Sequence, residues 1–244
     1  MSMYNILNYT GAAALVLYNL LHMKERRNFF GGRLRIYAAK YREAGKRSFL
    51  CSDTFCLVLE IIAISVFQYA PALFMNKAFG DLVGTGANYF GLMYLAPLFM
   101  YAGAWLIGTE AFKQIDIITP AYPLALFFSK LGCFATGCCR GFVWKYGFYN
   151  TASGYKEFPS QLLEAAVALL IFLFLVLKRK KIKDGTVFPI YLMLFSGLRF
   201  LTEFTRIEEA VFLGLKTYHY LCLVGLVIGA LEYYLAISDK RNIE

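Results

Sequence analysis

The stretch LLEAAVALLIFLFLVLKRKK, residues 162–181, decides the fold class of this chain. Apart from Glu164, every side chain from Leu162 to Leu177 is apolar, and the stretch ends in four consecutive basic residues. A helix needs about 17–25 apolar residues to cross the hydrocarbon core of a bilayer, and basic residues favour its cytoplasmic end. The stretch therefore predicts a transmembrane helix that ends at the cytoplasmic surface.

The composition of the whole chain also indicates a membrane protein. Of its 244 residues, 59% are hydrophobic and 17% are charged, whereas soluble domains carry about 25% charged residues. Apolar segments that predict spans lie at 4–22, 55–75, 88–108, 118–137, 162–177, 188–203 and 219–237. We therefore expect an all-α, polytopic membrane protein with about seven transmembrane helices. Residues 1–244 would form a single integral membrane domain.

Basic residues gather in two of the expected loops. The loop at 24–50 holds nine Lys or Arg and two Glu, and the loop at 178–185 holds five basic residues and one Asp. The positive-inside rule places such loops in the cytoplasm. The N-terminus would then lie outside and the C-terminus in the cytoplasm. The net charge of +9 is thus explained by orientation in the membrane, and we expect no nucleic-acid partner.

Polar and ionisable side chains occur near the outer ends of several expected spans. Such residues are costly in a membrane and usually face a cavity or a partner. Arg199 and Glu203 are four residues apart and share a helix face, and Arg206 follows three residues later. The other members of this set are Lys130, Ser160, Gln161, Glu164 and His219.

Two interpretations of these charges remain open. Arg199 and Glu203 can form a purely structural ion pair between helices. Alternatively, Arg199, Arg206 and Lys130 form a positive pocket, and guanidinium groups bind phosphate oxygens through paired hydrogen bonds. The headgroup of an outer-leaflet phospholipid is the anion available at that depth.

The segment KLGCFATGCCRG, residues 130–141, supports the second interpretation. Gly132, Gly137 and Gly141 would let the chain leave the helix, adopt positive φ and approach a ligand closely. Backbone N–H groups freed in this way can bind an anion. We therefore expect these glycines, together with Ser160 and Gln161, to line the phosphate site.

The same segment carries Cys133, Cys138 and Cys139 in a C-x4-C-C spacing. A disulfide or a structural role is favoured, because this end of the helix would face the oxidising side of the membrane. A catalytic or redox thiol is an alternative. A zinc site is disfavoured because paired cysteine motifs are missing and the two histidines, His22 and His219, would lie on opposite sides of the membrane. We expect no metal and no cofactor.

Several motifs in this order resemble those of the prolipoprotein diacylglyceryl transferase family, over residues 88–237. The segment RFLTEFTR, residues 199–206, matches the family pattern R-F-x-x-E-F-x-R at every fixed position. Weaker similarities lie in DIITP at 116–120, SKLGCFATGCCRG at 129–141, FPSQLLEA at 158–165 and HYLCLVGLVIGA at 219–230.

The resemblance implies a bacterial cytoplasmic-membrane enzyme with seven spans. Such enzymes transfer the diacylglyceryl group of phosphatidylglycerol to the thiol of a lipobox cysteine in a preprolipoprotein, and they release glycerol-1-phosphate. It implies a catalytic set of Arg199, Glu203, Lys130 and His219. The expected partners are the phospholipid and the lipobox protein.

This chain departs from the family pattern at several positions. Lys130 stands in the place of an arginine, Cys133 in that of an asparagine and Cys138 in that of a glutamate. Phe90 stands where the family has a histidine. Three interpretations therefore stay open: the family reaction on a lipobox cysteine, transfer of the lipid group to a different acceptor, and a non-catalytic role as a phospholipid-binding accessory protein.

Overall fold

The computed structural model describes residues 3–22, 74, 78, 89–107 and 111–238. The expected basic loop at 24–50 and the expected span at 55–75 lie outside these residues. The chain divides into two compact units, one of Met1–Leu21 with Ile118–Glu244 and the other of His22–Ile117. The candidate site lies entirely within the first unit.

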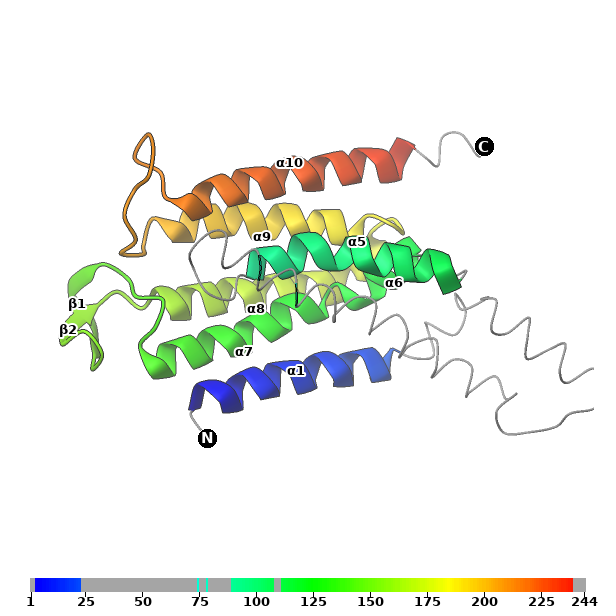
Figure 1. The fold of residues 1–244 in the computed structure, drawn as a ribbon. Coiled ribbons are helices and arrows are strands. Elements are labelled where there is room, and N and C mark those ends of the chain that lie inside the picture. The colour runs from blue at the N-terminus through cyan, green and yellow to red at the C-terminus, as the bar shows by residue number, and fades with distance from the viewer. Residues whose placement is uncertain (1–2, 23–73, 75–77, 79–88, 108–110, 239–244) are drawn as a thin grey trace, which may run out of the picture. The chain divides into compact units, whose positions relative to one another are not determined.

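The described chain is mostly helical. In the first unit, α1, α7, α8, α9 and α10 form a row in which each helix contacts the next (Figure 1). Their bounds are Met3–Leu21, Ala121–Thr136, Ser160–Lys178, Val187–Glu203 and Thr217–Ser238, and a short 3-10 turn, η2 at Arg179–Lys181, follows α8. The second unit contains α5, Tyr89–Ile107, and nearly all of α6, Ala111–Ile118.

Among the described residues, three helices are long and apolar enough to cross a membrane, namely Ile115–Thr136, Ser160–Lys181 and Thr217–Ser238. The second of them contains the stretch from which the fold class was predicted. The chain is therefore an integral membrane protein of mainly helical structure. The seven-span topology and its orientation stay predictions.

The expectation of a purely α-helical chain is incomplete, because a β-hairpin connects α7 to α8. Strand β1, Val143–Asn150, pairs antiparallel with β2, Tyr155–Glu157. β1 reads VWKYGFYN, and its aromatic and β-branched residues favour a strand. Gly147 permits close pairing, because a Cβ there would lie 2.1 Å from the carbonyl oxygen of Glu157.

Small residues allow the helices of the first unit to pack closely. Gly11 and Gly132 lie at the contact between α1 and α7, where a Cβ on Gly132 would meet the Tyr4 ring at 3.3 Å. Gly229 of α10 lies against Met193 and the Pro189 carbonyl of α9. Close helix packing through small residues is typical of membrane proteins. It brings the C-terminal ends of α7 and α9 to the same end of the row as the N-terminal ends of α8 and α10.

Candidate functional site

Glu164, one turn into α8, lies at the centre of a buried network of charges. Its Oε1 atom lies 3.1 Å from Nη1 of Arg199 and 3.7 Å from Nη1 of Arg206. Its Oε2 atom pairs with the ammonium group of Lys130. The carboxylate is 4% exposed, so it must be compensated by cations, and three cations from α7, α9 and the α9–α10 loop meet around it.

A second carboxylate binds Arg199 from within its own helix. Oε2 of Glu203 lies 2.6 Å from Nη2 of Arg199, and the Glu203 side chain is fully buried. The two residues therefore form the ion pair that their spacing of four predicts. Arg199 is itself only 7% exposed, so its charge is balanced by two glutamates inside the protein.

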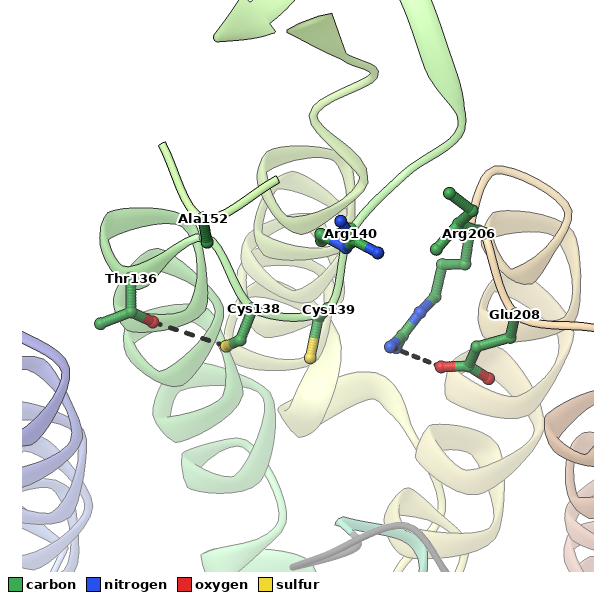
Figure 2. Close-up of a pocket in the computed structure, with 9 residues that line it drawn as sticks. Thr136, Cys138, Cys139, Arg140, Ala152, Arg206 and Glu208 are labelled. Atoms are coloured by element: carbon green, nitrogen blue, oxygen red, sulfur yellow. Dashed lines mark hydrogen bonds and ion pairs between the residues drawn. The ribbon is translucent and has the colours of Figure 1, made fainter. Parts of the chain in front are cut away.

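Arg206 reaches from this network into an open pocket. The pocket has a volume of about 400 Å³ and is lined by Thr136, Gly137, Cys138, Cys139, Arg140, Ala152, Arg206, Ile207 and Glu208. Figure 2 shows Cys138 and Cys139 beside each other on their loop, with the Arg206 side chain across the pocket from them. On the pocket side, Nη2 of Arg206 lies 2.7 Å from Oε1 of Glu208, which is 33% exposed.

An aromatic ring lies beside both arginines. The guanidinium carbons of Arg199 and Arg206 are 5.6 Å and 5.8 Å from the centre of the Tyr218 ring. Attraction between a cation and a ring is strongest where water is excluded. Tyr218, at the start of α10, thus helps to hold the two guanidinium groups in place.

The loop after α7 forms the opposite wall of the pocket. Helix α7 ends at Thr136 and is capped by Gly137, whose φ of +70° is favourable for glycine. Beyond it, the Phe142 N–H donates to the Thr205 carbonyl and the Ile207 N–H donates to the Arg140 carbonyl. These bonds join the loop to the segment that carries Arg206 and fix the width of the pocket.

The expected ligand-binding role of the glycines needs correction, because only one of the three has positive φ. Gly132 remains inside α7 and packs on α1, and Gly141 lies against the Phe158 carbonyl, where a Cβ would approach to 2.2 Å. Positive φ among the three occurs at Gly137. Gly137 lines the pocket, whereas Gly132 and Gly141 serve close packing.

Ser160 and Gln161 hold backbone segments in place. The Ser160 hydroxyl is buried, donates to the Thr205 carbonyl over 2.9 Å and accepts from the Thr205 hydroxyl over 2.8 Å. Nε2 of Gln161 donates to the Cys138 carbonyl. The first turn of α8 therefore positions both walls of the pocket, instead of presenting these two polar groups to it.

His219 is also fully buried and is not among the residues that line the pocket. Its Nδ1 accepts the backbone N–H of Lys216 over 3.0 Å, and its ring packs 4.4 Å from Phe204 and 4.8 Å from Phe200, between ring centres. An Nδ1 that already accepts a hydrogen bond is not free to take a proton from a substrate. The fully buried Glu203 is likewise not among the residues that line the pocket.

Lys216 closes the C-terminal end of α9. Its ammonium group donates to the carbonyls of Glu203 and Arg206, over 2.8 Å and 2.5 Å. A cation at this position satisfies carbonyls that a helix end leaves without partners. Lys216 thereby fixes the backbone on which Arg206 is placed.

The three cysteines in the last turn of α7 and in the loop after it are free thiols whose sulfur atoms lie close together. The Sγ atoms of Cys133 and Cys139 are 3.9 Å apart. Hydrogen bonds with Cys133 and Cys138 lower the pKa of the Cys139 thiol, and the charges of Lys130 and Arg206 act in the same direction. A disulfide within this cluster stays a prediction.

Four residues that shape the site in the structure were given no role in it by the sequence analysis. Glu164 was noticed as a polar residue in a span but was given no role, and Lys216, Tyr218 and Glu208 gave no motif-level signal. The signal for Glu164 was available, because a lone carboxylate near the end of a long apolar helix requires cationic partners. The other three depend on how the α9–α10 loop folds.

Comparison with known proteins shows to which family the chain belongs. The sequence model of the prolipoprotein diacylglyceryl transferase family matches residues 29–235. The chain belongs to this family. The match covers most of the chain and begins well before residue 88, from which the motifs were traced in the sequence.

Individual prolipoprotein diacylglyceryl transferases are distant relatives of the chain. The phosphatidylglycerol–prolipoprotein diacylglyceryl transferase of Dehalococcoides mccartyi is 28% identical over 177 residues, which cover 66% of this chain and 64% of that protein. That of Clostridium tetani is 27% identical over 156 residues, with 60% and 63% covered. That of Campylobacter hominis is 32% identical over 134 residues, with 52% and 48% covered. The chain thus matches less than two thirds of the length of these relatives.

Proposed function

We propose that this protein transfers the diacylglyceryl group of an outer-leaflet glycerophospholipid, with phosphatidylglycerol as the donor. The single observation that carries the proposal is the position of Arg206, which is anchored by the buried Glu164 and opens into the pocket. The family and the names of its relatives supply the reaction class. Lipobox-containing preprolipoproteins are the proposed acceptors.

The proposed phosphate site consists of Arg206 and Arg140, which line the same pocket. Arg206 is held in place from behind by Glu164, so its guanidinium group is oriented before the lipid arrives. The partly exposed Glu208 forms an ion pair with Arg206 on the pocket side. A phosphate group would displace this carboxylate and form paired hydrogen bonds with the guanidinium.

In the proposed reaction, the acceptor thiolate attacks the glycerol carbon that carries the phosphate. A carbon–sulfur bond forms, the carbon–oxygen bond breaks, and its electron pair leaves with glycerol-1-phosphate. Negative charge grows on the departing phosphate oxygen, where Arg206 and Arg140 would stabilise it. Lys130 and Arg199 act in this scheme by fixing Glu164, and hence Arg206, from the interior.

The acceptor thiol must lose a proton before or during attack. Glu203 and His219, which the sequence suggested, are buried in contacts of their own. Among the described residues that line the pocket, Glu208 is the acidic one. We propose Glu208 as the group that receives this proton after the lipid phosphate has displaced it from Arg206.

The placement in the membrane follows from the same proposal. Seven spans with the N-terminus outside would put the pocket at the outer leaflet of a bacterial cytoplasmic membrane, where phosphatidylglycerol and lipoprotein precursors meet. The charge distribution of the loops supports this orientation.

A second candidate function is a phospholipid-binding accessory protein without transferase activity. It is favoured by Phe90, which lies in α5 at the sequence position of the family histidine and cannot transfer a proton. It is also favoured by the burial of Glu203 and His219. In this case the pocket would hold the lipid but would not react.

One assay separates the two functions. The purified protein is incubated in lipid vesicles with phosphatidylglycerol and a lipobox peptide, and mass spectrometry measures the diacylglyceryl peptide and glycerol-1-phosphate. Equal amounts of both products support the transferase. Release of glycerol-1-phosphate without the peptide adduct indicates another acceptor. Stable lipid binding without either product supports the accessory function.

A further inference from the structure

Three cysteines at the edge of the pocket bring their sulfur atoms close enough together to act as ligands of one ion. The Sγ atoms of Cys133, Cys138 and Cys139 all lie within 4.8 Å of one another. Cys133 is buried, Cys139 is half-buried and Cys138 is exposed. Cys138 and Cys139 line the pocket, so the group can be reached from the outside through the pocket.

The backbone is shaped in an unusual way to bring these sulfurs together. Cys133 lies in the last turn of α7, and the Cys138 N–H donates to its carbonyl over 3.1 Å. Cys139 adopts a φ of +57°, which is uncommon for a residue with a side chain and is found preferentially at functional sites. The hydrogen bond from Gln161 to the Cys138 carbonyl holds the loop in this form.

The distances between the sulfurs fit one bound ion. Zinc binds thiolate sulfur at about 2.3 Å, so two sulfurs on the same ion lie roughly 3.8–4.0 Å apart. Sγ of Cys139 is 3.9 Å from Sγ of Cys133. A disulfide would require the two atoms to move to about 2.05 Å. Thus the Cys133–Cys139 spacing already suits coordination of one ion, and the Cys138 sulfur lies within 4.8 Å of both.

The surrounding charges also suit three thiolates. Three thiolates and one Zn²⁺ carry a net charge of −1, and neighbouring cations would balance it. Lys130 lies three residues before Cys133 on the same face of α7. Arg206 and Arg140 line the same pocket as Cys138 and Cys139.

We propose that Cys133, Cys138 and Cys139 bind one Zn²⁺ ion as thiolates and leave its fourth coordination position open to the pocket. Binding releases one proton from each thiol that is protonated beforehand and involves no oxidation. Three protein ligands with an open fourth position are typical of zinc sites that bind a substrate atom, whereas structural zinc sites are closed by four. The sequence spacing had argued against a metal, because it does not show that the loop returns Cys138 and Cys139 to Cys133.

The test titrates the reduced, detergent-solubilised full chain with Co²⁺ and then displaces the cobalt with Zn²⁺. We expect one Co²⁺ per chain, with intense thiolate-to-cobalt absorption, and its loss on addition of one equivalent of Zn²⁺. Cys139→Ser should weaken binding at least tenfold. A control variant with Cys51, Cys56 and Cys222 all changed to Ser should bind as the wild type does.

Three outcomes would overturn the proposal. They are a reduced protein that gives no thiolate-to-cobalt absorption, binding that persists unchanged in Cys139→Ser, and binding that is lost in the triple control variant. The unfolding temperature of the metal-free Cys139→Ser protein, compared with that of the metal-free wild type, verifies that the variant is correctly folded. Protein isolated without reductant is also measured by intact mass, and a mass two hydrogens lower, retained after Zn²⁺ is added, would assign a disulfide to the cluster instead.

Discussion

Oε1 of Glu164, on α8, lies 3.1 Å from Nη1 of Arg199, on α9. Both side chains of this ion pair are buried, and the pair joins the two helices. The same carboxylate also contacts Lys130 and Arg206. Glu164 therefore determines where all three cations lie, and Arg206 is the one that extends to the pocket.

Glu164→Gln should destabilise the protein, because it leaves three buried cations with one buried carboxylate fewer. Removal of one partner from a buried ion pair costs about 3–5 kcal/mol. The measurement is the unfolding temperature in detergent, with the exposed Glu209→Gln as control. An unchanged unfolding temperature in Glu164→Gln would show that the network contributes little to the fold.

Arg199→Ala should reduce stability more than Arg206→Ala does. Arg199 compensates two buried glutamates, Glu164 and Glu203, whereas Arg206 is paired partly with the half-exposed Glu208. We expect Arg199→Ala to lose about 3 kcal/mol or more. Denaturant unfolding of both variants in the same detergent gives the comparison, and a larger loss in Arg206→Ala would contradict it.

Glu208→Gln should strengthen lipid binding and weaken transfer. The neutral amide competes less with a phosphate for Arg206, but it cannot receive the thiol proton. Retained phosphatidylglycerol is counted by native mass spectrometry, and transfer is followed with the lipobox peptide. We expect transfer to fall by at least about a hundredfold, the low end for loss of a general base. Unchanged transfer would remove Glu208 from the proposed mechanism.

Gly141→Ala should disrupt the pocket wall. The added Cβ would lie 2.2 Å from the Phe158 carbonyl oxygen and 2.6 Å from Oγ of Ser160. Forced overpacking of this kind costs about 1–3 kcal/mol. Gly197→Ala is the matched control, because its nearest neighbour is 4.0 Å away and alanine favours a helix. Equal unfolding temperatures for the two variants would rule out the close contact at Gly141.

Much of the helical architecture could be predicted from the sequence. The apolar segment at 162–177 lies within α8, Ser160–Lys178, because a long apolar run leaves a membrane helix few alternatives. The placement of Lys130, Arg199 and Arg206 at one end of the row also follows from alternating helix directions. The hairpin at 143–157 was missed because its strands lie in a loop between two apolar segments.

The roles of individual site residues could not be read from the sequence. Whether Gly132 faces α1 or a ligand depends on the rotation of α7 about its axis, and apolar periodicity is weak in a helix that is apolar on most sides. Arg206 lines the pocket and Arg199 does not, because α9 ends at Glu203 and Arg206 lies in the loop that follows. The thiols come together because Cys139 has a positive φ. A cysteine in the sequence does not indicate that its backbone will adopt this conformation.

Arg206→Ala tests the central claim most directly, with Lys145→Ala as a control for an exposed basic residue on the neighbouring hairpin. Both variants and the wild type are compared for phosphatidylglycerol retained on purification and for diacylglyceryl transfer to the lipobox peptide. A charge-assisted hydrogen bond contributes roughly 1.5–3 kcal/mol, so Arg206→Ala should lower both quantities about tenfold or more while the control changes neither. Wild-type lipid retention and transfer in a folded Arg206→Ala protein would contradict the account.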